Sequence, residues 1–184
     1  KFLIKQSISY LPQLFSHDGF LRLIKSFFNI LYFLKIKNNF KKAYVSNFSS
    51  DNGSLISLSE IIDIYCNKDD YGYIFLKMDI EGSEYRILDD IIKYQDIFSS
   101  IIIEFHNIDL NMDRIINFID ILKMDLVHIH PNNFGGVDKN NNPLVVEITF
   151  AKNASYISEE VILPNPFDSP NNYKSEDIKL KFQK

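Results

Sequence analysis

Short apolar runs of strand length alternate along this chain with segments that carry apolar residues on one helical face, and this alternation limits the fold more than any other feature. The strand-like runs are residues 73–80, 101–105, 126–130 and 144–150. Helical spacing of apolar residues occurs between them, in residues 83–94 and 111–123. Alternating strands and helices predict an α/β fold with a mostly parallel sheet and helices on both faces. The last two strands have no helix between them, so we expect an antiparallel pair at the sheet edge.

The residues before the first long strand predict smaller elements. Apolar residues in the stretch 20–34 recur at steps of three and four, which favours an amphipathic helix packed on the sheet; a membrane-surface helix is the alternative. Residues 43–45 suit a short strand. Ser57 and Glu60 fit a capping box, which predicts a helix that begins after Ser57 and runs to about Tyr65.

The same patterns suggest how the chain is organised. We expect residues 1–56 to be a helical and irregular segment of one domain whose core is residues 57–152. Residues 153–184 contain prolines and mainly polar side chains, so we predict an extended polar tail.

Composition excludes several classes of protein. Hydrophobic residues make up 46% and charged residues 24% of the 184, which is typical of a globular domain. The net charge of −4 leaves no overall basic footprint for nucleic acid. Cys66 is the single cysteine, so a disulfide framework and a cysteine-based zinc site are excluded. No run has the length and apolarity of a membrane span, and the start does not look like a signal peptide, so we expect a cytoplasmic protein.

Charged side chains alternate at the end of the first long strand. Lys77, Asp79 and Glu81 share one face of an extended strand, and Gly82 allows a sharp turn directly after them. Isolated charges are too costly to bury, so these side chains either line a wet crevice or pair with one another. A Lys77–Asp79 structural pair, with Glu81 and Glu84 compensating a helix dipole, explains the pattern equally well.

Histidines close the next two strands. Glu104 and His106 alternate, and a carboxylate beside an imidazole favours a general base; a half-buried structural histidine is the alternative. His128 and His130 share a face, and a metal site there would need an acid from elsewhere in the chain. Asn132 and Asn133 open a loop that suits either a sugar or phosphate ligand or a plain turn.

These pieces together resemble a known family. FLKMDIEGSEYRIL at residues 75–88 resembles the core motif of FkbM-type S-adenosylmethionine-dependent methyltransferases, in which a strand ending in Lys-x-Asp-x-Glu-Gly-x-Glu leads into a helix. SLSEII at 57–62, IIIEFHNID at 101–109, LVHIHPNNFGG at 126–136 and NPLVVEITF at 142–150 are similar to further parts of the family, in the same order. The resemblance covers about residues 57–152.

The resemblance implies a fold and an activity. The fold is the Rossmann-type sheet of class I methyltransferases, with its antiparallel terminal hairpin, and the activity is methyl transfer from S-adenosylmethionine to a hydroxyl of a sugar or glycan. The implied catalytic residues are Asp79, Glu81, Glu104 and His106, with His106 as the base that Glu104 orients. The implied acceptor contacts are His128, His130, Asn132 and Asn133, and the implied cofactor contacts are Asp79 and Lys77.

One feature departs from the family pattern. The Gly-rich turn that holds the cofactor is missing, because no Gly-x-Gly sequence occurs. We therefore expect the chain to correspond to the C-terminal part of such an enzyme, without its first strands, and to self-associate through an exposed sheet edge. A non-catalytic remnant or glycan-binding module, and a metal-dependent hydrolase that uses Asp79, Glu104 and the histidines, stay open as alternatives.

Overall fold

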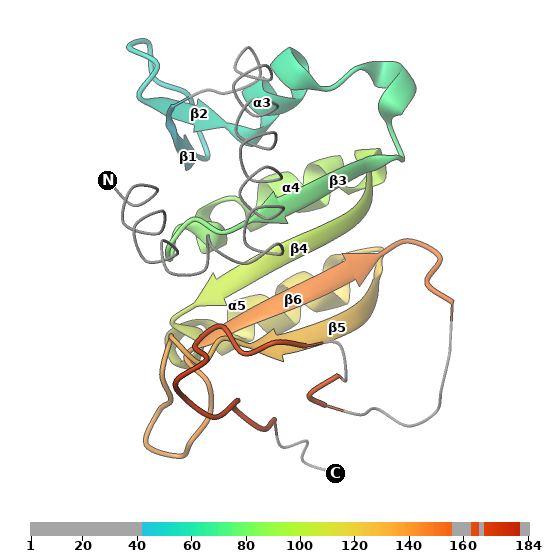
Figure 1. Ribbon diagram of the computed structural model, residues 1–184. Helices are drawn as coiled ribbons and strands as arrows, with labels where there is room; N and C mark the ends of the chain where they lie inside the picture. The colour runs from blue at the N-terminus through green and yellow to red at the C-terminus, as the bar shows by residue number, and fades with distance from the viewer. Residues whose placement is uncertain (1–41, 156–162, 166–167, 181–184) are drawn as a thin grey trace, which may run out of the picture. The chain divides into compact units, whose positions relative to one another are not determined.

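The structure is a computed structural model that describes residues 42–155, 163–165 and 168–180 (Figure 1). The chain divides into two compact units, residues 1–42 and 43–184, and the described helices and strands belong to the second unit. The helix expected at 20–34 lies outside the described residues.

A four-stranded mixed sheet forms the centre of this unit. Its strands are β3 (Ile74–Met78), β4 (Phe98–His106), β5 (Asp125–Pro131) and β6 (Val145–Ala151), in the order β3-β4-β6-β5. β3 and β4 are parallel, whereas β6 is antiparallel to both β4 and β5. The antiparallel terminal pair is therefore confirmed, with β5 at the edge. The prediction of a mostly parallel sheet is confirmed only in part. Strands β3, β4 and β5 run in the same direction, but β6 lies between β4 and β5, so two of the three described ladders of this sheet are antiparallel.

A second, smaller sheet precedes the main one. β1 (Tyr44–Ser46) and β2 (Leu55–Ser57) form a two-stranded parallel pair. The strand predicted at 43–45 matches β1, whereas β2 was not predicted because three residues are too few to show a period.

The helices begin where local side chains satisfy the first backbone amides. Helix α3 (Leu58–Tyr65) has the predicted cap, since the Ser57 hydroxyl accepts a hydrogen bond from the Glu60 amide at 3.2 Å. Helix α4 (Leu88–Tyr94) begins later than predicted, because the short 3₁₀ turn η4 (Glu84–Arg86) follows Ser83, which makes no side-chain cap. Helix α5 (Ile108–Ile121) begins earlier than Asn111, with Asn107 as its cap residue. Two further 3₁₀ turns, η3 (Lys68–Asp70) and η5 (Gln95–Ile97), complete the regular elements.

The core lies between the sheet and helices α4 and α5, which cover the same face (Figure 1). Ile101, Ile103 and Phe105 alternate along β4 and are fully buried. Phe118 of α5 meets Phe150 of β6 edge-on, with ring centroids 5.8 Å apart. These aromatic and branched side chains supply most of the apolar area that stabilises the fold.

The opposite face of the sheet is polar along several strands. Alternate residues of β3, β4 and β6 on this face are only half-buried or exposed. Lys77 forms an ion pair with Glu147 at 2.8 Å, and Glu147 is opposite Glu104 in the ladder. Helices on both faces were predicted, but within the described residues α4 and α5 share one face, and β3 is not covered on both sides.

Candidate active site

Three polar clusters predicted from the sequence converge where strands β3, β4 and β5 end. These strands run in the same direction, so their carboxyl ends lie at one edge of the sheet, the usual ligand-binding position in α/β folds. The carboxyl and imidazole atoms of Asp79, Glu104 and His106 lie within 4.8 Å of one another. Asn132, from the loop after β5, donates a hydrogen bond to Glu104 at 2.5 Å. The ends of β3 and β4 therefore form one cluster, which Asn132 joins from the loop after β5.

A carboxylate–histidine dyad lies in this cluster. His106 Nδ1 is 3.0 Å from Oε1 of Glu84, which is fully buried. A carboxylate accepts hydrogen bonds, so the imidazole donates from Nδ1 and its Nε2 is left as the basic nitrogen. Glu81, whose side chain is 86% exposed, lies 3.5 Å from Nε2. The arrangement suits a general base that faces solvent.

The backbone around the dyad is held in unusual conformations. Glu84 Oε1 also accepts hydrogen bonds from the amides of Ile80, at 3.3 Å, and of Gly82, at 3.0 Å. Glu81 and Asn107 have φ angles of 54° and 52°, and Gly82 has a φ of 92°. Left-handed backbone at non-glycine residues costs free energy and persists where the surrounding contacts impose it. Around Glu81 and Gly82 the buried Glu84 supplies such contacts, because it binds the Ile80 and Gly82 amides.

A pair of carboxyl groups, those of Asp79 and Glu104, lies beside the dyad. Burial, joined by the neighbouring Asp79 carboxylate, raises the pKa of Glu104, and the hydrogen bond from Asn132 acts against this rise. The group of Asp79, Glu104 and His106 is also spaced such that it could hold a metal ion. Glu104 therefore adds to the cluster a carboxyl group that keeps its proton to a higher pH than an ordinary glutamate does.

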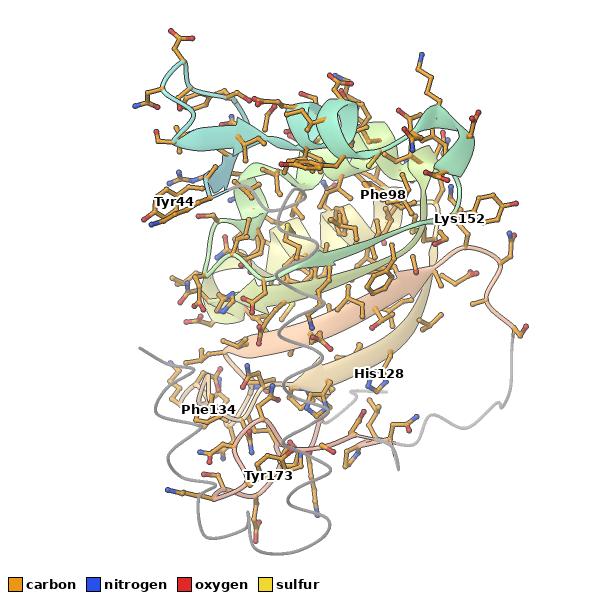
Figure 2. The ribbon with its side chains drawn as sticks, turned by 45° about the horizontal axis from the view of Figure 1, so that its top comes forward. Tyr44, Phe98, His128, Phe134, Lys152 and Tyr173 are labelled. Atoms are coloured by element: carbon orange, nitrogen blue, oxygen red, sulfur yellow. The ribbon has the colours of Figure 1, made fainter. Side chains whose placement is uncertain are left out.

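The β5 and loop residues that were predicted to contact an acceptor are engaged within the chain. His128 Nε2 is 2.9 Å from Asp168, and His130 Nε2 is 3.1 Å from the side-chain oxygen of Asn171. Figure 2 shows His128 on β5, on the side from which the C-terminal segment approaches. Asn133 binds the backbone of that segment through both its amide nitrogen and its oxygen. Asn132 accepts from the Phe134 amide while it donates to Glu104. Of these side chains, Asn132 alone is hydrogen-bonded to the carboxyl cluster.

Two predicted contacts have other partners than expected. Lys77 pairs with Glu147 rather than with Asp79, and this hydrogen bond raises the pKa of the lysine. Glu84 orients the His106 ring, whereas Glu104 accepts a hydrogen bond from Asn132. Sequence reasoning treated Glu84 as a helix-dipole residue. Its place in the Glu-Gly-x-Glu motif was the available signal for a site role.

In comparisons with known proteins, no protein-family model, curated protein or solved structure matches the chain. In the described part of the chain, no helix has both the length and the apolar character needed to cross a membrane.

Proposed function

We propose that this chain carries the acceptor-activating part of an S-adenosylmethionine-dependent O-methyltransferase that acts on a hydroxyl of a sugar or glycan. The Glu84–His106 dyad at the carboxyl ends of the strands is the observation that carries the proposal. The α/β fold with an antiparallel terminal pair and the resemblance of residues 57–152 to FkbM-type enzymes support it. S-adenosylmethionine is made inside cells, so the proposal places the reaction in the cytoplasm.

The carboxylates near β3 fit such a cofactor. Asp79 and Glu81 both have exposed side chains, and their negative charge suits a sulfonium cation and ribose hydroxyls. When bound, S-adenosylmethionine supplies an electrophilic methyl group. Lys77 is left out of the proposed cofactor contacts, because its ammonium group is held by Glu147.

His106 is the proposed general base. Its Nε2 takes the proton of the acceptor hydroxyl, while Nδ1 remains hydrogen-bonded to Glu84. The resulting imidazolium is stabilised by Glu84 at 3.0 Å and by Glu81 at 3.5 Å. The carboxyl oxygens of Asp79 and Glu104 accept hydrogen bonds from the neighbouring hydroxyls of the sugar. The hydrogen bond from Asn132 holds the Glu104 carboxyl in position.

The proposal is tested with the complete 184-residue chain. Calorimetric titration with S-adenosylhomocysteine measures cofactor binding, and transfer of a labelled methyl group to a panel of sugars and glycans measures activity. We expect micromolar binding and a hydroxyl acceptor among the sugars. We expect His106→Ala to lower kcat by about 10²- to 10⁴-fold with little change in cofactor binding, the range that general bases contribute.

The control for this test is a substitution at an exposed residue outside the dyad. Asp120→Asn, on the exposed side of α5, should leave both binding and turnover unchanged. Absence of cofactor binding by the folded chain would contradict the assignment of Asp79 and Glu81 as cofactor contacts. Unchanged turnover in the His106→Ala variant would contradict the assignment of the base.

A further inference from the structure

A second group of polar side chains lies on β5, which β6 separates from the strand of His106, and it takes no part in the proposed reaction. His128 and His130 share one face of β5, and Asp168 comes to them from the C-terminal segment. Asp168 Oδ1 is 2.9 Å from His128 Nε2, and its Oδ2 is 3.5 Å from His130 Nδ1. One ligand atom from each residue lies within 4.8 Å of the other two.

The hydrogen bonds of His130 determine which nitrogen faces Asp168. His130 is 8% exposed, and its Nε2 lies 3.1 Å from the side-chain oxygen of Asn171. An amide oxygen only accepts, so Nε2 carries the proton and the neutral ring has its lone pair on Nδ1. Nδ1 is buried without a hydrogen-bond partner and is directed at the Asp168 carboxylate. Two electron-rich atoms in a buried site repel each other unless a cation lies between them.

The partners around this group are those of a metal site. Asn171 fixes the His130 ring from behind, and the Asn165 amide donates to Asp168 Oδ2 at 2.7 Å. Hydrogen bonds of this kind, made to the ligating side chains, orient metal ligands in proteins. Two imidazoles with one carboxylate suit Zn²⁺ and related first-row ions, and a three-ligand set leaves a position for water.

We propose that His128, His130 and Asp168 bind a divalent transition-metal ion, with Zn²⁺ as the preferred ion, and that this ion ties the C-terminal segment to β5. The competing arrangement is a doubly protonated His130 that forms an ion pair with Asp168. The site does not depend on the proposed methyl transfer, because neither histidine belongs to the dyad.

The test uses the complete chain, stripped with chelator and then titrated with Zn²⁺ by calorimetry. We expect one equivalent of zinc per chain, retained after dialysis and measured by mass spectrometry. Asp168→Asn should weaken zinc binding by more than about 100-fold, since losing a residue that only hydrogen-bonds to a metal ligand already costs about 10- to 100-fold. Asn171→Ala should weaken it by about 10-fold. Glu176→Gln, an equal charge change at an exposed residue of the same segment, should have no effect.

Two further measurements separate the outcomes. Co²⁺ in place of Zn²⁺ should give visible absorption bands that His130→Ala abolishes, and circular dichroism checks that each variant is folded. Zinc binding that Asp168→Asn leaves unchanged would overturn the proposal. It would also be overturned by absence of zinc binding together with nitrogen NMR shifts of an imidazolium at His130.

Discussion

The Glu84 carboxylate accepts hydrogen bonds from two backbone amides and from His106 through a single oxygen atom. It is fully buried, three residues after the exposed Glu81. Each of these bonds has a charged acceptor, the class that contributes most to stability. Glu84 therefore joins the turn after β3 to the end of β4, and the catalytic geometry depends on the same bonds as the fold.

Glu84→Ala should lower the free energy of unfolding by about 3 kcal/mol, measured by urea denaturation. Hydrogen bonds to charged groups contribute about 1.5–3 kcal/mol each, and the substitution removes the acceptor of the Ile80 and Gly82 amides. The matched change Glu81→Ala, at an exposed side chain, should alter stability by no more than about 0.5 kcal/mol. Equal losses in the two variants would show that Glu84 has no special structural role.

At the scale of elements, the parallel pairing of β3 with β4 brings acids from two strands together. Met78 is opposite Ile103 in the register, so the following residues, Asp79 and Glu104, become neighbours at the strand ends. Burial and the Asp79 carboxylate raise the pKa of Glu104. The folded state therefore keeps the Glu104 proton to a higher pH than the unfolded state does. The stabilising contribution is complete below the unfolded pKa of about 4.3 and is lost as the pH rises through the folded pKa.

The Glu104→Gln variant should thus gain more stability over the unsubstituted chain at pH 7 than it does at pH 4. Glutamine removes the repulsion from Asp79 and still accepts the hydrogen bond from Asn132. Thermal unfolding measured from pH 4 to 7 should show the difference in Tm growing with pH. Asp120→Asn on the exposed side of α5 serves as the control. A difference in Tm that stays constant across this range would contradict the raised pKa.

At the scale of the whole described unit, the C-terminal segment is bound to the end of the sheet without regular secondary structure of its own. Asn133 donates to the backbone oxygens of Asn172, Ser175 and Glu176, and its own oxygen accepts from the Asn172 amide. His128 and His130 hold the same segment through Asp168 and Asn171. A segment that looks like a polar tail in the sequence is therefore fixed by residues about 40 positions earlier in the chain.

Asn133→Ala should release this segment and leave the sheet folded. A net loss of about 1.4 kcal/mol, roughly that of one or two hydrogen bonds, corresponds to about a tenfold increase in cleavage of residues 164–180 during limited proteolysis. Asn140→Ala, on an exposed turn of the same loop, should leave the cleavage rate unchanged. Equal cleavage of the Asn133→Ala variant and the unsubstituted chain would mean that other contacts hold the segment.

Much of the element pattern could be predicted because it depends on neighbouring residues. The Ser57 cap, the apolar runs of β3 and β4 and the hairpin strands all follow from local spacing of apolar and capping residues. The sequence also placed Asp79, Glu104 and His106 at strand ends, and parallel pairing then brings them together. The predicted start of α4 was wrong because a 3₁₀ turn, Glu84–Arg86, lies between Ser83 and the helix, and no local pattern reveals it.

The sequence by itself determined which polar residues stand at the carboxyl ends of the strands, since period and strand length are local properties. Only the tertiary structure decided their partners. Lys77 meets Glu147 across 70 positions, His128 meets Asp168 across 40, and His106 meets Glu84 across 22. A charged side chain in the folded protein pairs with the opposite charge that the packed strands and helices place beside it. Its neighbours in the sequence do not determine that partner.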